Sequence, residues 1–194
     1  MKLRYLAPVV AFALTTVAAH AQVGVYFNPI AIRVSNSVLD SGPFDYFSPG
    51  KTSQVMYGFD FGGFYDFYHA GKLDGGLGLR ESDLHTNNAV LQSFLLSARV
   101  SAHPFSRPFK PYLEAAVGKG TSKSPLSTVR IGKVDFGVFA GVDYTLHRHV
   151  DFRVVEIGYG SLITSSSATI GGGGTIAIPP STLLNFSTGL VFHF

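Results

Sequence analysis

The feature that most constrains the fold is a two-residue alternation of apolar with small or polar side chains, which recurs from Val23 to the end of the chain. This period is typical of β-strands whose two faces meet different environments. Over residues 133–146 one face carries seven apolar side chains, and the other carries Asp135, Gly137, Phe139, Gly141 and Asp143. The same pattern predicts eight strands, at residues 23–34, 54–68, 72–83, 90–103, 110–119, 133–146, 150–161 and 182–194.

The connections between these strands alternate in length. Residues 35–53, 84–89, 120–132 and 162–181 form mostly long and polar connections, whereas residues 69–71, 104–109 and 147–149 form short ones. Most strands reach the roughly 9 to 11 residues that a tilted membrane strand needs. We therefore expect an all-β, eight-stranded antiparallel up-and-down barrel with its long loops at one end.

The composition of the less apolar face favours a transmembrane barrel over a soluble β-sandwich or lipocalin-like barrel, which would also alternate. A water-exposed face is rich in Lys, Glu and Thr, but this face is built largely of glycines and isolated acids, which suit a crowded interior. Large aromatic side chains lie towards the strand ends on the apolar face, as in the interface girdles of membrane barrels. Charged residues make up only 14% of the chain, against about 25% in an average soluble domain.

The N-terminal segment, residues 1–21, has the pattern of a cleavable signal peptide. Basic Lys2 and Arg4 precede an apolar stretch, and Ala19-His20-Ala21 forms an A-x-A cleavage site before Gln22. The barrel domain is then expected to span residues 22–194. Because two of the basic residues lie in the removable segment, the net charge of +3 gives little support to nucleic-acid binding.

The C-terminal run Leu184-Asn185-Phe186-Ser187-Thr188-Gly189-Leu190-Val191-Phe192-His193-Phe194 and the motif Pro111-Tyr112-Leu113-Glu114-Ala115-Ala116-Val117-Gly118 carry a family resemblance. The chain resembles the small outer-membrane β-barrels that include opacity proteins and the barrel domain of outer-membrane protein A. The resemblance implies that Leu190, Phe192 and Phe194 are read by the barrel-assembly machinery after delivery by periplasmic chaperones. It also implies a monomer in a Gram-negative outer membrane, with both termini periplasmic and its long loops outside among lipopolysaccharide.

Charged side chains with lumen parity predict an ion-pair network inside the barrel. Folding the sequence about the short turns sets Arg99 opposite Glu114 and Asp60 opposite Arg80. Acids outnumber bases on this face, so a wet lumen would favour cations. Two interpretations stay open: the pairs satisfy one another inside a filled barrel, or they gate an ion path. The expected network contains Asp60, Arg80, Arg99, Glu114, Asp135 and Glu156.

Two further features concern the same lumen. Residues 60–64 and 135–139 share the pattern D-F-G-x-F, which suggests that Phe64 and Phe139 plug the lumen from opposite walls, with nearby glycines making room. Arg153 and Glu156 have opposite parity, so a regular strand cannot point both inward. An outward Arg153 is expected at the periplasmic edge or beside a bulge.

No catalytic residue, metal site or cofactor is predicted. The chain has no Cys, and none of its seven histidines belongs to the His-x-Ser pair that a lipid-A deacylase of this architecture would require. The predicted function is a structural scaffold that presents surface loops for envelope integrity, adhesion or another interaction. A narrow cation-preferring channel is the alternative, and a lipid-modifying enzyme has the weakest support. The extracellular partner is not identified by the sequence.

Basic and acidic side chains near the loop ends are the remaining candidates for binding lipopolysaccharide phosphates, directly or through a divalent cation. They are Lys119, Lys123, Arg130 and Lys133 on the basic side, and Glu81, Asp83 and His85 on the acidic side. Solvated loop and strand ends are the simpler interpretation.

Overall fold

A computed structural model describes residues 22–36, 51–87, 89–103, 108–123, 130–164, 168–170, 174–176 and 180–194. Eight long strands dominate it. They are β1 (Gln22–Ser35), β2 (Ser53–Ala70), β3 (Leu73–His85), β4 (Val90–Ala102), β5 (Phe109–Lys123), β6 (Arg130–His147), β7 (Val150–Thr164) and β10 (Ser181–His193).

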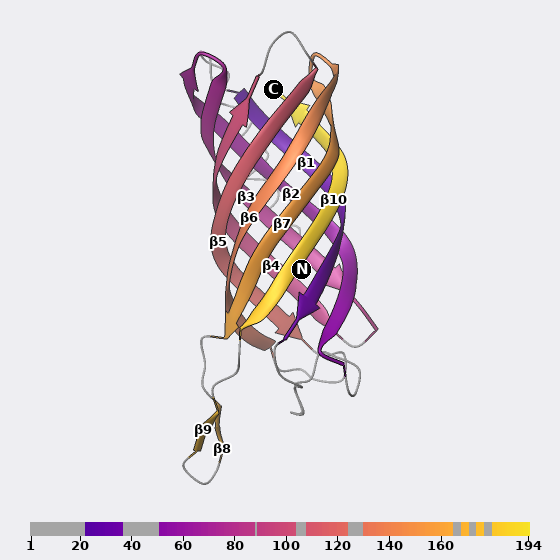
Figure 1. Cartoon of the computed structure of the whole chain (residues 1–194), viewed down its shortest axis with the longest axis vertical. Coiled ribbons are helices and arrows are strands. Elements are labelled where there is room, and N and C mark those ends of the chain that lie inside the picture. Colours follow the sequence, from indigo (N-terminus) through magenta and orange to yellow (C-terminus); the bar gives the residue numbers. More distant parts are fainter. Residues whose placement is uncertain are drawn as a thin grey trace, which may run out of the picture.

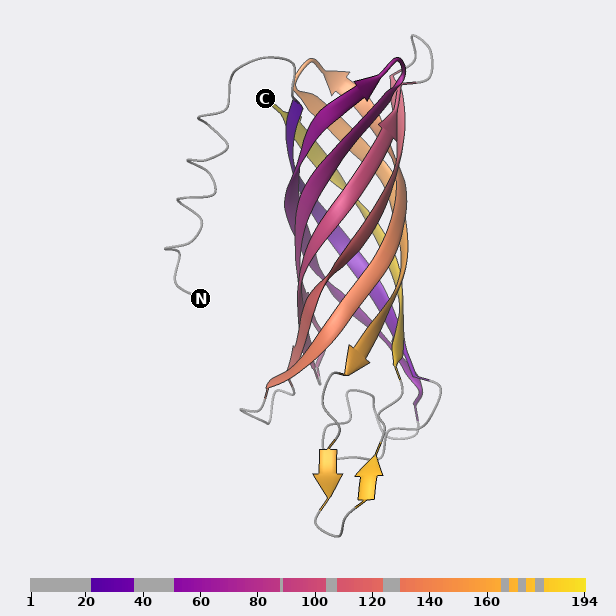
Figure 2. The same ribbon diagram turned by 90° about the vertical axis from the view of Figure 1, so that its left-hand side faces the viewer.

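These eight strands form a closed antiparallel barrel in the order β1-β10-β7-β6-β5-β4-β3-β2 (Figure 1). The first and last strands close it, with pairs that run from Gly24 and His193 to Ser35 and Thr182. We call the rim where β1 begins the terminus end and the opposite rim the loop end. Figure 2 shows the tilted strands as a tall cylinder, with the start of β1 and the end of β10 at one rim.

The predicted strands are confirmed, and each boundary lies within four residues of the expectation. The short connections at residues 69–71 and 147–149 lie at the terminus end; between β2 and β3, Gly71 has a φ of 65°, a left-handed conformation that suits glycine. One feature was not predicted. Within the 162–181 connection, β8 (Ala168–Ile170) and β9 (Gly174–Ile176) pair antiparallel beyond the loop end of the barrel (Figure 2).

The two faces of the barrel wall are inverted relative to those of a water-soluble protein. The outward face is largely apolar, with side chains such as Tyr57, Phe94 and Tyr159 more than half exposed. Most of the charged side chains within the strands are instead buried in the lumen. An apolar surface of this extent needs an apolar environment, which the hydrocarbon of a bilayer provides.

In the described part of the chain, no helix is both long enough and apolar enough to cross a membrane.

Candidate functional site in the barrel lumen

A continuous chain of buried ion pairs crosses the middle of the lumen. Arg80 donates to Asp60 at 2.9 Å and to both oxygens of Glu156 at 2.9 and 2.8 Å. Glu156 also lies 3.4 Å from Arg153, which donates to Asp143 at 2.9 Å. Asp143 in turn accepts a hydrogen bond of 3.1 Å from Arg99. Acids and bases therefore alternate from Asp60 to Arg99, so that each inner member is shared between two partners.

Neutral side chains complete the hydrogen bonding of the two central acids. The Tyr112 hydroxyl donates to Glu156 at 2.6 Å, and Ser187 donates to the other oxygen of Glu156 at 3.0 Å. Ser82 donates to Asp60 at 3.1 Å. Buried carboxylates are tolerated when they are paired and their remaining lone pairs accept hydrogen bonds, and Asp60 and Glu156 meet both conditions.

Four aromatic rings alternate with the three arginines. The Arg80 guanidinium lies 4.0 Å from the centroid of Phe139, and Arg99 lies 4.0 Å from both Phe64 and Tyr112. Arg153 lies 4.6 Å from both Tyr26 and Tyr112. Guanidinium groups stack on aromatic faces, so the rings stabilise the arginines and fill the space between them.

Glycines on the neighbouring strands, each the register partner of one ring, make room for these rings. A Cβ atom at Gly24 would overlap the ring of Phe64, and one at Gly158 would overlap Phe139. Gly62 and Gly141 stand in the same relation to Tyr26 and Tyr112. The predicted inward position of Phe64 and Phe139 beside glycines is thus what the structure shows; Tyr26 and Tyr112 were missed by the sequence analysis.

A β-bulge brings Arg153 into the lumen beside Glu156. Val142 pairs with Val155, but the next residue, Asp143, pairs with Arg153, so Val154 is an extra residue in β7. The register of β10 against β7 shifts at the same place. Because the extra residue reverses the alternation, Arg153 and Glu156 are 0% and 1% exposed. The bulge therefore explains how Arg153 and Glu156, which have opposite parity in the sequence, both point into the lumen.

The predicted pairs need two corrections. Arg99 and Glu114 are register partners, but the ion pair of Arg99 is with Asp143, and Glu114 lies 3.4 Å from Arg80. Arg80 does pair with Asp60, although the register partner of Asp60 is Ser82. Arginine side chains are long enough to pass their nearest cross-strand neighbour and reach the far wall, which folding about a turn does not anticipate.

Asp135 was predicted to belong to the ion-pair network, but in the structure its hydrogen-bond partner is Ser93. It lies in the lumen closer to the loop end, where Ser93 donates to it at 2.6 Å. Its surroundings are a cluster of buried aliphatic side chains that fills the loop-end half of the lumen. This cluster contains Ile30, Ile32, Val34, Met56, Leu84, Ala89, Leu91, Leu162 and Leu183.

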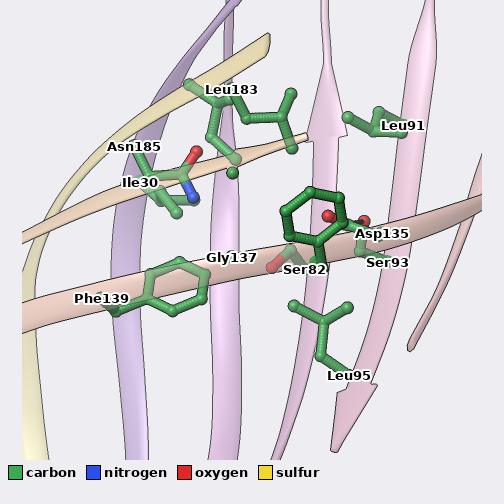
Figure 3. Close-up of a pocket in the computed structure, with 13 residues that line it drawn as sticks. Ile30, Ser82, Leu91, Ser93, Leu95, Asp135, Gly137, Phe139, Leu183 and Asn185 are labelled. Atoms are coloured by element: carbon green, nitrogen blue, oxygen red, sulfur yellow. Dashed lines mark hydrogen bonds between the residues drawn. The ribbon is translucent and has the colours of Figure 1, made fainter. Parts of the chain in front are cut away.

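Little space is left between the ion-pair network and the aliphatic cluster. A cavity of about 10 Å³, room for about one water molecule, lies where the aliphatic cluster meets Phe139. Figure 3 shows Leu95, Leu183, Asn185 and Asp135 around it. Among the described residues, the lumen is filled by side chains at two successive levels.

The terminus end of the lumen is held by a shared carboxylate. Asp151, at the start of β7, accepts a hydrogen bond from Lys110 of β5 at 2.9 Å and lies 2.7 Å from His193 of β10. Leu190 and Phe192 of β10, and Phe194 directly after that strand, are exposed. The predicted assembly signal therefore lies at the end of the strand that closes the barrel against β1.

Several predicted features lie outside the described residues or at the ends of strands. Ala19 and Ala21 of the predicted cleavage site are outside the described residues, and Gln22 is the first residue of β1. Of the predicted connection at residues 147–149, His147 is instead the last residue of β6, and His149 lies in the turn at the terminus end. In the part of the chain that the structure describes, no group of three His, Asp or Glu side chains is arranged to hold a metal ion.

Comparison with known proteins identifies the fold. No protein-family model matches the chain, and no curated protein matches it. The solved structure of Neisserial surface protein A is similar over 91% of this chain and 100% of that chain, with 17% sequence identity and a TM-score of 0.59. Ail, the attachment invasion locus protein of Yersinia pestis, solved with the heparin analogue sucrose octasulfate, covers the same shares at 11% identity and a TM-score of 0.51.

At these identities the likeness concerns the fold. The chain has the closed eight-stranded antiparallel barrel of small bacterial outer-membrane proteins, as the resemblance in its sequence implied.

Proposed function

We propose that the protein is an integral outer-membrane protein whose sealed barrel serves as a structural scaffold for its loop-end segments, without a catalytic role. In this proposal the loops face the cell exterior and contribute to envelope integrity, adhesion or another surface interaction. The termini lie in the periplasm, and the outward side chains at the end of β10 engage the barrel-assembly machinery during biogenesis.

The filled lumen is the observation that carries this proposal. Arg80, Glu156 and Arg153 join opposite walls at mid-height, and the aliphatic cluster fills the loop-end half. An eight-stranded barrel is just wide enough for side chains to fill. A solid interior of this kind supports the wall mechanically and leaves the loop end as the surface available for interactions.

The aliphatic cluster also weighs against the alternative of a cation-preferring channel. Ion paths are lined by polar groups that replace the water of hydration, and Leu84, Leu91 and Leu183 offer none. A rearrangement of the ion pairs alone would leave this second layer in place. For this reason the scaffold is favoured over the channel.

Localisation and surface labelling test the proposal. An epitope tag inserted between β8 and β9 should be accessible to antibody on intact cells, and the protein should fractionate with the outer membrane. A tag at the C-terminus should become accessible only after the outer membrane is permeabilised. The proposal fails if the protein fractionates elsewhere or if the C-terminal tag is the one exposed on intact cells.

A further inference from the structure

The outer wall of the barrel carries one polar sector near its loop end, on β3, β4 and β5. We use the name polar sector for the outward residues Glu81, Asp83, His85, Gln92, Lys119, Thr121 and Lys123. Near the loop ends of β6, β7 and β10, the described outward side chains include the apolar Val134, Ile163 and Leu184. Among the described outward side chains near this rim, the charged ones lie mainly on β3 and β5, and Arg33 on β1 is the exception.

An exposed aromatic ring lies between an acid and a base in this sector. In the cross-strand register, Glu81 of β3 is the partner of Phe94, and Phe94 is the partner of Lys119 of β5. Phe94 is 54% exposed, and its neighbours project from the same outward face. A charged group on each side of an exposed ring is an unusual arrangement on a surface that otherwise faces hydrocarbon.

The next outward row adds further polar groups. Asp83 is the register partner of Gln92, and Gln92 is the partner of Thr121. Gln92 donates to Asp83 at 3.4 Å, and His85 lies 3.1 Å from the same carboxylate. Asp83, whose side chain is 42% exposed, is therefore positioned by two neighbouring polar side chains in the row next to that of Phe94.

From this arrangement we infer that the polar sector binds the phosphorylated sugar headgroup of an outer-leaflet glycolipid. The inference rests on the proposed function, because that places the loop end in the outer leaflet. An ammonium group such as Lys119 binds phosphate, and carboxylates such as Glu81 accept hydrogen bonds from sugar hydroxyls. The face of Phe94 offers an apolar surface against which the C–H face of a sugar ring packs.

This combination of groups distinguishes a phosphorylated sugar from other lipid headgroups. A phospholipid supplies a phosphate for Lys119 but lacks a rigid sugar ring to pack against Phe94 and to offer hydroxyl groups to Glu81. A neutral sugar lacks the charge that Lys119 requires. Only a headgroup that carries both parts uses the whole sector.

Native mass spectrometry of the purified, folded full-length protein tests the inference. The probes are bisphosphorylated lipid A, the same lipid A with both phosphates removed, and phosphatidylglycerol of matched acyl length. We expect the wild-type protein to retain one molecule of bisphosphorylated lipid A in preference to the other two. Lys119→Ala should weaken this binding about tenfold, and Lys119→Arg should retain most of it.

Arg33→Ala is the matched control for the loss of a cation. Arg33 also lies on the outward face near the loop end, but on β1, where it donates to Ser53 at 3.3 Å. Its replacement should leave lipid A binding unchanged. Equal weakening by Arg33→Ala and Lys119→Ala, or equal retention of phosphatidylglycerol and lipid A, would overturn the inference.

The result also separates this inference from the proposed function. Outer-membrane localisation without selective retention of lipid A contradicts the glycolipid site alone. Localisation outside the outer membrane contradicts the proposed function, whatever the purified protein binds.

Discussion

Arg80 on β3 and Glu156 on β7 join diametrically opposite strands of the barrel through two hydrogen bonds of 2.9 and 2.8 Å. Both side chains are buried, so this bidentate pair acts as a strut across the lumen. Asp60 and Glu114 contact Arg80, Arg153 contacts Glu156, and Asp143 and Arg99 are linked to the pair through Arg153.

Removing one charge of the Arg80–Glu156 pair should lower the free energy of unfolding strongly. Glu156→Gln leaves Arg80 and Arg153 with one acceptor fewer in a dry interior, so the free energy of unfolding should fall by about 3–5 kcal/mol. Urea titration of the refolded barrel, followed by mobility on unheated gels, measures it. Glu81→Gln on the outer wall is the control and should change little. An unchanged unfolding midpoint for Glu156→Gln contradicts the strut.

The fit between Phe139 and Gly158 predicts coupled mutations. Gly158→Ala inserts a methyl group into space that the Phe139 ring occupies, which should destabilise the barrel by about 1–3 kcal/mol. In a Phe139→Leu background the same substitution should cost less, which gives a coupling energy of about 1 kcal/mol or more. Gly75→Ala, whose Cβ would meet Tyr68 at an ordinary 3.6 Å, is the control. Additive effects would show that the ring does not occupy this space.

The bulge in β7 predicts a role for a side chain of β10. The Thr188 hydroxyl donates to the backbone carbonyl of Arg153 at 2.7 Å, next to the extra residue. Thr188→Val preserves the shape but removes the donor, and we expect a loss of about 1 kcal/mol in the free energy of unfolding. Thr182→Val, nearer the loop end of the same strand, should cost less. The reverse order would show that the bulge does not depend on this hydrogen bond.

The carboxylate of Asp151 on β7 contacts side chains of β5 and β10, so it should stabilise the terminus end of the barrel. Asp151→Asn weakens the contacts with Lys110 and His193 at once, so we expect a loss of about 2 kcal/mol. Thermal unfolding monitored by gel mobility provides the measurement, with Asp83→Asn on the outer wall for comparison. Equal midpoints for Asp151→Asn and the wild-type protein would show that the contact adds no stability.

The strands were predictable because their signal is local and repeated. A period of two over more than ten residues identifies a strand such as β6, and turn lengths then order the strands around the barrel. The same alternation predicts that the side chains of Asp60 and Arg80 point into the lumen, where the structure places them. In each case the inference needs only the chain's own alternation.

The detailed pairing was not predictable for two physical reasons. The inward position of Arg153 depends on a bulge. The opposite parity of Arg153 and Glu156 points to an irregularity in the sequence, but it does not fix where the extra residue lies or which side chain it turns inward. The partners of Arg99 and Glu114 depend on how far long side chains reach across a curved wall, which strand register alone does not fix. The aliphatic layer likewise emerges only when residues from different strands are brought together.

The most direct test of a sealed scaffold is the single-channel current of the refolded protein in a planar lipid bilayer, with folding checked by mobility on unheated gels. The filled lumen predicts no conductance steps from the wild-type protein. It also predicts none from Arg99→Ala, because the aliphatic cluster with Leu84 and Leu183 stays in place. Reproducible cation-selective steps from the folded wild-type protein, altered by Arg99→Ala or Glu114→Ala, would contradict the sealed barrel and show that the ion pairs gate a water-filled path.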